Sequence, residues 1–386
     1  MDEFETLKDN CLKITEYKVL GELPDPFLFD NGNYVKTEND WYERKKEIYK
    51  TAIELQYGTQ PPKPEFLEVE TLYTAKDACV YKIHTGTYKN PISFRMQVFL
   101  PTDKGEKFPF IIDGDGCWMY HTKENFVFQA VKNGVGMVYF DRTELAHDIY
   151  HEERGQGDLY KVYPEYTFGS LGAWAWGYSR CIDALEKLNL PVDFDYLTIT
   201  GHSRGGKTCA LAGALDDRVK IVNPNETCAG ACGCYRIQMQ AIYENEPEFR
   251  SEKLKDLLTH FPQWMGPEMG KYIDCEEKLP FDTHFLKAMI APRILFVSEA
   301  AGDIWSNPIG SYITSEAARE VYKFLGAEDN LYWYFRPGLH AHKPLDLYML
   351  VNLIKHRREG TELSERMFKL PFTAPEQPYK WRCPDK

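Results

Sequence analysis

Near the middle of the chain stands the segment Leu197-Thr198-Ile199-Thr200-Gly201-His202-Ser203-Arg204-Gly205-Gly206-Lys207. Its first part is apolar and β-branched, which is typical of a buried strand, and the residues after Lys207 favour a helix. Between the two lies the pattern G-x-S-x-G, which marks a sharp strand-to-helix turn that exposes a serine hydroxyl. The bare pattern also occurs by chance in tight turns, but the strand before it and the helix after it predict a nucleophilic Ser203.

The two glycines of this pattern have a steric reason. A Cβ atom at Gly201 or Gly205 would collide with the neighbouring strand or helix, and the serine between them is held in a strained conformation. The N-terminus of the following helix lies beneath the serine, where backbone N–H groups can bind an oxyanion.

The composition limits the classes of protein to consider. Of the 386 residues, 43% are hydrophobic, which is enough for a large core. The net charge of −12 argues against a nucleic-acid partner, which requires a basic face. No apolar run is long enough to span a bilayer, so no membrane partner is expected. Aromatic residues make up 14%, which suits a carbohydrate-facing surface and an ordinary large core equally well.

The N-terminal residues and the cysteines indicate in which cellular compartment the protein is expected. The first eight residues are acidic and lack an apolar stretch, so we expect no signal peptide and a cytoplasmic location, or secretion if a leader has been removed. The ten cysteines are then expected to be reduced. Cys228, Cys232 and Cys234 form a cluster, but no second cluster with zinc spacing accompanies it, so small buried residues are favoured. We predict no metal and no cofactor.

The order of expected elements predicts an α/β fold. Residues 1–40 are predicted to be a poorly patterned N-terminal extension, and residues 41–386 a single catalytic domain. Three alternating segments, 66–74, 78–87 and 92–100, indicate antiparallel strands. Strands and helices then alternate, which predicts a mostly parallel sheet between helical layers, the three-layer sandwich of an α/β-hydrolase. A helical insertion is expected at about 235–290.

A serine nucleophile requires a base and an acid. The base is predicted to be His340, because it follows the last expected strand in a Gly-x-His loop, with His342 as the alternative. Two carboxylates compete to orient the histidine. Asp303 and Glu226 each follow a strand that should neighbour the active site. Two alternatives are open: one acid orients the histidine while the other assists, or one of them only caps a turn. The order serine, acid, histidine along the chain is that of an α/β-hydrolase.

The sequence resembles a known family, the glucuronoyl esterases of the carbohydrate esterases. The elbow Gly201–Lys207 is similar to the family pattern G-[CH]-S-R-x-G-K, which is far more specific than G-x-S-x-G. Further similar segments run from about Trp41 to Lys355: Ala173–Arg180, Leu279–His284, Ala291–Arg293, Asp303–Gly310 and the histidine loop from Gly338 to Asp346.

The resemblance implies roles for individual residues. Ser203 would be the nucleophile and His340 the base, with Glu226 and Asp303 at the two acid positions of the family. Arg204 would contribute to the oxyanion hole, and Lys207 and Trp305 would contact a glucuronic acid unit. A cation at a helix N-terminus opposes the helix dipole, which favours a functional reason for Arg204 and Lys207.

We therefore expect a serine esterase that cleaves an ester of a uronic acid, with a small carbohydrate ester or an oligosaccharide as substrate. The alternatives are a carbohydrate acetyl esterase, in which the sugar is on the alcohol side, and an inactive hydrolase fold that binds sugars. The sequence carries no prediction of the alcohol part of the ester or of the oligomeric state.

Overall fold

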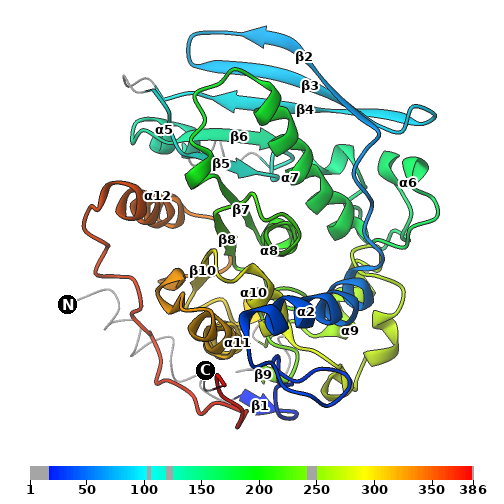
Figure 1. Ribbon diagram of the computed structural model, residues 1–386, viewed down its shortest axis with the longest axis vertical. Coiled ribbons are helices and arrows are strands. Elements are labelled where there is room, and N and C mark those ends of the chain that lie inside the picture. Colours follow the sequence, from blue (N-terminus) through cyan, green and yellow to red (C-terminus); the bar gives the residue numbers. More distant parts are fainter. Residues whose placement is uncertain (1–16, 102–105, 119–124, 241–249, 385–386) are drawn as a thin grey trace.

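The computed structural model describes residues 17–101, 106–118, 125–240 and 250–384. The main sheet is built from the strands β2 (Phe66–Thr74), β3 (Ala78–Gly86), β4 (Pro91–Phe99), β5 (Phe110–Asp113), β6 (Gly136–Phe140), β7 (Thr198–His202), β8 (Ile221–Asn225), β10 (Ile294–Ala300) and β11 (Leu331–Arg336). These nine strands lie in the order β11-β10-β8-β7-β5-β6-β4-β3-β2 (Figure 1).

The sheet has two parts with different strand directions. β2, β3 and β4 pair antiparallel with one another, and β4 pairs antiparallel with β6. From β6 to β11 all neighbours are parallel. The parallel strands are buried along their whole length, because helices cover both of their faces. The predicted α/β-hydrolase fold, with a mostly parallel sheet and antiparallel N-terminal strands, is confirmed.

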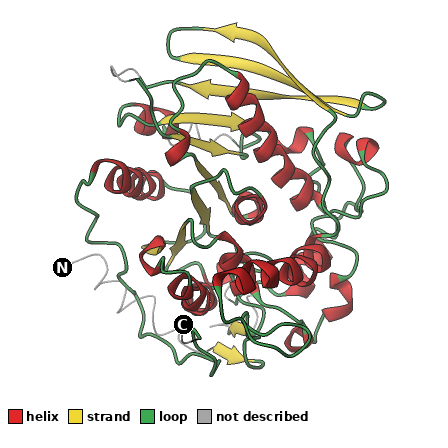
Figure 2. Ribbon diagram, in the orientation of Figure 1, coloured by secondary structure: helices red, strands yellow, loops and turns green. Residues whose placement is uncertain are grey.

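Two helical layers enclose the sheet (Figure 2). One face is covered by α5 (Phe126–Val131) and α12 (Pro344–Glu359), and the apolar side chains of these helices form one core with the sheet. The other face carries α7 (Ser170–Lys187), α8 (Arg204–Leu215), α10 (Thr283–Ile290) and α11 (Pro308–Phe324), which share a larger core. Besides short 3-10 turns in the loops, the other elements of the described chain are β1 (Tyr17–Val19), β9 (Ile237–Met239), α2 (Glu38–Ile48), a π-helical turn Tyr49–Glu54, α3 (Leu55–Tyr57), α6 (Asp158–Val162) and α9 (Leu254–His260).

The N-terminal segment is part of the domain, which differs from the extension expected for residues 1–40. Within its described part, β1 pairs antiparallel with β9. Leu23, Phe27 and Val35 are buried in the larger core. The C-terminal segment packs on the same region, since Trp381 donates a hydrogen bond from Nε1 to the carbonyl of Leu23 at 2.8 Å. The segment looks poorly patterned because its apolar residues are anchored by long-range contacts and follow no helical or strand period.

The insertion expected at about 235–290 contains less helix than predicted. Its described part holds the strand β9, the short helix α9, two 3-10 turns and α10. β9 is a strand because β1, far away in sequence, supplies its partner. Residues 241–249 of this insertion lie outside the described residues.

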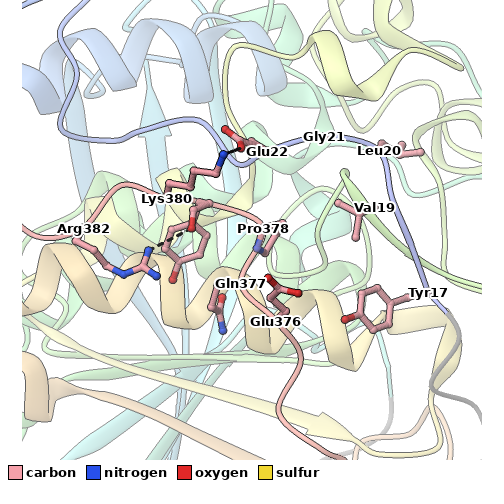
Figure 3. A pocket seen from close by; sticks show the side chains of 11 residues that line it. Tyr17, Val19, Leu20, Gly21, Glu22, Glu376, Gln377, Pro378, Lys380 and Arg382 are labelled. Carbon is pink, nitrogen blue, oxygen red and sulfur yellow. Dashed lines mark hydrogen bonds and ion pairs between the residues drawn. The ribbon is translucent and has the colours of Figure 1, made fainter.

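Two features of the surface concern possible partners. None of the helices in the described part of the chain has the length and apolar character needed to cross a membrane. A cavity of about 810 Å³ opens between β1 and the C-terminal segment, lined by Tyr17, Glu22, Lys380 and neighbouring residues (Figure 3). Its lining contains none of the predicted catalytic residues, so this cavity is separate from the site described below.

The packing of the N-terminal segment predicts a large stability loss for Phe27→Ala. Phe27 is 1% exposed and its ring contacts those of Trp41, Phe324 and Trp381. Truncating a buried phenylalanine leaves a cavity, so we expect the free energy of unfolding to fall by about 3–5 kcal/mol in urea denaturation. Tyr34→Ala is the control, because Tyr34 is 54% exposed and should change stability by less than about 0.5 kcal/mol. Equal values for the two variants would show that the segment is peripheral.

Candidate active site

The four predicted catalytic residues meet at one edge of the sheet. Ser203 follows β7, Glu226 follows β8, Asp303 lies in the loop after β10, and His340 lies in the loop after β11. β7, β8, β10 and β11 are consecutive neighbours and run parallel. Their carboxyl ends therefore lie side by side, which is where α/β proteins place their active sites.

Ser203 sits in a strained turn. Its backbone has φ 55° and ψ −119°, a conformation that a residue with a side chain rarely adopts. Glycine is required on both sides of the serine, because neither position has room for a side chain. A Cβ atom on Gly201 would lie 2.4 Å from the carbonyl oxygen of Gly205, and one on Gly205 would lie 2.1 Å from Oδ1 of Asp115. Ser203 also donates its backbone N–H to the carbonyl of Asn225 at 2.9 Å.

His340 contacts both candidate acids. Its Nδ1 lies 2.6 Å from Oδ2 of Asp303 and 3.4 Å from Oε2 of Glu226. Burial opposes ionisation of Asp303, but the hydrogen bond and charge of His340 outweigh it and hold its pKa below the ordinary value. Burial raises the pKa of Glu226 well above the ordinary value, against the opposing effect of Arg336. Distance and charge both make Asp303 the direct partner of the imidazole.

Glu226 has a second set of contacts that hold the histidine loop. Its Oε2 accepts the backbone N–H of Ala341 at 2.9 Å, and its Oε1 accepts a hydrogen bond from Arg336. Arg336 also donates to the carbonyls of Leu339 and Ala341 and to the Asp346 carboxylate. The glutamate thus fixes the loop on both sides of the imidazole, in addition to its longer contact with the ring.

Two other histidines are near the site but are packed inside. His202 is 2% exposed, and its Nδ1 lies 2.6 Å from Oδ1 of Asn225. Burial lowers the pKa of His202 well below its ordinary value, so it stays neutral. His342 is 3% exposed, and burial lowers its pKa to about 3. His340 is more open, with a side chain 36% exposed. Its ring centroid lies 4.7 Å from that of His202, the residue that directly precedes Ser203. The alternative base His342 is therefore poorly placed to exchange protons.

Arg204 begins α8 directly after the serine. Its Nη1 donates to Oδ1 of Asp148 at 2.9 Å, and its guanidinium carbon lies 4.4 Å from the ring centre of Phe261. The Nε atom is buried and has no hydrogen-bond partner among the described residues. The side chain as a whole is 24% exposed, so N–H donors of the guanidinium that Asp148 does not bind can reach a bound group beside the serine.

Lys207 is almost completely buried, which the sequence did not indicate. Its Nζ donates to the carbonyls of Thr227 and Ala229 and to Oε2 of Glu252 at 2.9 Å, and the residue is 1% exposed. An ammonium group has three donors, so a sugar hydroxyl can bind it only by displacing one of these acceptors. The backbone of Glu252 in turn donates to the carbonyl of half-buried Trp305 at 3.0 Å. The predicted sugar contacts Lys207 and Trp305 are thus linked through Glu252.

Sequence reasoning missed Glu252 and Asp148. Neither belongs to a motif, and their partners are 45 and 56 residues away along the chain. The only available signal was indirect. Two cations at the start of a helix oppose its dipole, which indicates that anions lie nearby but not which ones.

Helix α7 contains the aromatic segment Ala173–Arg180, and its side chains contact the chain segments around the site. The indole N–H of Trp174 donates to the carbonyl of Ala146 at 2.8 Å, and that of Trp176 donates to the carbonyl of Pro62 at 2.8 Å. The hydroxyl of Tyr178 accepts from the backbone of Gly114 and donates to the carbonyl of Thr200 in β7. These contacts give the aromatic motif a structural role.

Metal ligation is a weaker interpretation of the same residues. His202, Glu226 and His340 each offer one ligand atom, and these atoms lie within 4.8 Å of one another. The contacts described above already engage all three residues, and they account for the arrangement without an ion. Cys228, Cys232 and Cys234 are free and buried, as expected for small core residues.

The chain matches the family model described as "Glucuronyl esterase, fungi" over residues 83–326. It is similar to the 4-O-methyl-glucuronoyl methylesterase of Podospora anserina, with 32% identity over 84% of this chain and 64% of the relative. It is also 30% identical to the methylesterase of Hypocrea jecorina, over 83% of this chain and 66% of that protein. The chain thus spans slightly less than two thirds of the length of these two relatives.

Solved structures give the same result. A carbohydrate esterase family 15 glucuronoyl esterase from Caldicellulosiruptor kristjansonii superposes with a TM-score of 0.81 at 26% identity, covering 95% of this chain and 98% of the other. The glucuronoyl esterase catalytic domain of Hypocrea jecorina gives 0.77 at 26% identity, over 93% and 95% of the two chains. A mutant enzyme from Sporotrichum thermophile, in complex with methyl 4-O-methyl-β-D-glucopyranuronate, gives 0.73 at 25%, over 91% of each chain.

The buried Lys207–Glu252 pair predicts a specific stability pattern. Lys207→Met leaves the Glu252 carboxylate buried without its cation, and breaking a buried pair in this way costs about 3–5 kcal/mol. We expect the double variant Lys207→Met/Glu252→Gln to regain part of this loss, because the uncompensated charge is then gone. Urea denaturation of the wild type, the single variants Lys207→Met and Glu252→Gln, and the double variant measures the free energies of unfolding. Strictly additive losses would show that the two side chains are not coupled.

Proposed function

Because the chain belongs to the glucuronoyl esterase family, we propose that it is a serine esterase that hydrolyses esters of glucuronic acid. The observation that carries the proposal is the hydrogen-bonded pair His340–Asp303, at 2.6 Å, beside the strained turn of Ser203. A serine, a histidine and an acid at adjacent strand ends form the arrangement required for acyl transfer.

The reaction proceeds in two halves. Ser203 Oγ attacks the carboxyl carbon of the ester while His340 Nε2 takes its proton, and Asp303 stabilises the imidazolium by accepting the hydrogen bond from Nδ1. The same imidazolium then gives its proton to the departing alcohol, which leaves a glucuronoyl ester on Ser203. Water, deprotonated by His340, attacks this ester. The free acid is released and Ser203 regains its proton.

The negative charge that develops on the carbonyl oxygen needs donors. The N-terminus of α8 supplies backbone N–H groups beside Ser203, and the guanidinium of Arg204 supplies a charged donor from the N–H groups that Asp148 does not bind. Such donors act most strongly where water is excluded, and the side chain of Arg204 is only 24% exposed.

The sugar is proposed to bind on the side of Lys207, Glu252 and Trp305. The half-buried indole of Trp305 offers an apolar face for the sugar ring, and the Glu252 carboxylate offers an acceptor for a hydroxyl. Lys207 would bind a hydroxyl by giving up one of its three present acceptors. The complex of methyl 4-O-methyl-β-D-glucopyranuronate with the Sporotrichum thermophile mutant supports a uronic acid on the acyl side.

The test is a comparison of two substrates. We expect benzyl glucuronate to be hydrolysed with a far higher kcat/KM than an acetylated xylo-oligosaccharide. Ser203→Ala should lose about 10⁶-fold in kcat, because the nucleophile is removed. Ser179→Ala, a half-buried serine of α7 outside the site, is the matched control and should retain activity. A preference for the acetylated substrate would make the protein an acetyl esterase, and failure of Ser203 to react with a serine-directed phosphonate would favour a sugar-binding protein.

The geometry of the two acids predicts that substituting them lowers kcat by different factors. Asp303→Asn should lower kcat by about 10³–10⁴-fold, because the direct partner of the imidazole no longer fixes its tautomer. Glu226→Gln should lose about 10- to 100-fold through displacement of the histidine loop. The double variant should lose less than the product of the single losses, since both residues act on the same imidazole. A strictly multiplicative result, or a larger loss for Glu226→Gln, would contradict this ranking.

A further inference from the structure

The guanidinium of Arg204 is enclosed by three aromatic rings from two segments of the chain. Its central carbon lies 5.6 Å from the ring centre of Trp118, 4.4 Å from that of Phe261 and 4.6 Å from that of Trp264. Phe261 and Trp264 are themselves stacked, with centroids 4.0 Å apart and planes inclined by 6°. Stacking on aromatic faces fixes the plane of a guanidinium, but it leaves the group free to slide and rotate within that plane.

One carboxylate removes this remaining freedom. Oδ1 of Asp148 accepts from Nη1 of Arg204 at 2.9 Å and from the indole N–H of Trp264 at 3.2 Å. Asp148 therefore ties the cation to the ring on which it stacks. The aspartate side chain is 6% exposed, so these hydrogen bonds are shielded from water and from salt.

Asp148 is itself anchored to the elbow. Its Oδ2 accepts from Nη2 of Arg142 at 3.0 Å, and Arg142, with no exposed surface, also donates to Asp115. Oδ2 of Asp115 accepts the backbone N–H of His202 at 2.8 Å. Arg142 is held between the rings of Trp118 and Trp174, at 4.7 and 4.8 Å. A continuous chain of alternating charges thus connects the strand before Ser203 to the side chain after it.

The carboxylates of this chain of charges offset the repulsion between two neighbouring cations. Arg204 is the first residue of α8, where the helix dipole disfavours a cation. A second cation, Arg142, lies close by, because it binds the same Asp148 carboxylate. Asp148 lies between the two cations and, together with Asp115 on the far side of Arg142, balances their charges. Asp148 binds Arg204 at Nη1, and the Arg204 side chain is 24% exposed, so the carboxylate orients the group while other N–H donors remain available to a substrate.

We propose that Asp148 is a positioning residue that fixes the Arg204 guanidinium so that the N–H donors it leaves unbound stabilise the developing oxyanion. This inference rests on the proposed function, because it requires the oxyanion role of Arg204. Asp148 accepts hydrogen bonds throughout the reaction and exchanges no proton. Loss of the Asp148 charge should therefore lower the rate of the chemical step, and only as long as Arg204 is present.

The experiment is a double-variant cycle in the full chain. Asp148→Asn keeps the size of the side chain but removes its charge, and we expect kcat to fall by about 10- to 100-fold with KM changed by less than about twofold. The fall should be the same for benzyl glucuronate and p-nitrophenyl acetate, since both reactions develop an oxyanion. Asp148→Glu restores the charge and should recover part of the lost kcat. In an Arg204→Met background, Asp148→Asn should cause no further loss.

Asp183→Asn is the matched control. Asp183 also bridges two arginines, Arg180 and Arg218, each at 2.7 Å, but it lies on α7 outside the site. It should lower the midpoint of thermal unfolding without lowering kcat. If Asp148→Asn reduces kcat equally with and without Arg204, the positioning role is wrong while the esterase proposal stands. If Arg204→Met itself leaves kcat within about twofold, both the oxyanion role and the positioning role are wrong.

Discussion

The close contact between β7 and α8 at Ser203 is the constraint on which the site depends. There is no room for a side chain at Gly201 or Gly205, and the carboxylate of Asp115 fills the space directly beneath the turn. The serine is held at φ 55° because its surroundings leave it no relaxed alternative. The same carboxylate binds the backbone of His202, so the strained turn and the charged network behind it are one structure.

The remaining parts of the site are arranged around this turn by the sheet. Parallel neighbours place Glu226, Asp303 and His340 at the same edge as Ser203, although they are far apart in the sequence. The histidine loop then needs its own support, and the contacts of Arg336 with Glu226 and with the loop carbonyls provide it. Buried charges are costly unless they are paired, and the buried Arg336 is paired with Glu226 and Asp346 on either side of the loop that carries His340.

Two carboxylates beside one imidazole have different environments and hence different roles. Asp303 makes the shorter contact, and His340 holds its pKa low, which suits a charged partner of the imidazolium. Glu226 is more deeply buried and is occupied by Arg336 and by the backbone of Ala341. The sequence placed both acids at strand ends but left their order open, because strand position says nothing about which oxygen reaches the ring.

Local patterns in the sequence were sufficient for the fold class, and they also placed the predicted nucleophile, base and two acids at the strand ends that the sheet brings together. G-x-S-x-G with its flanking strand and helix, and polar residues at strand ends, are determined by backbone geometry over a few residues. Packing decided the rest. His342 lies two residues from His340 and is buried, Lys207 has its three donors occupied, and the N-terminal segment belongs to the core through Phe27. Asp148 and Glu252 have partners far away in the sequence, so only the folded chain brings these charges together.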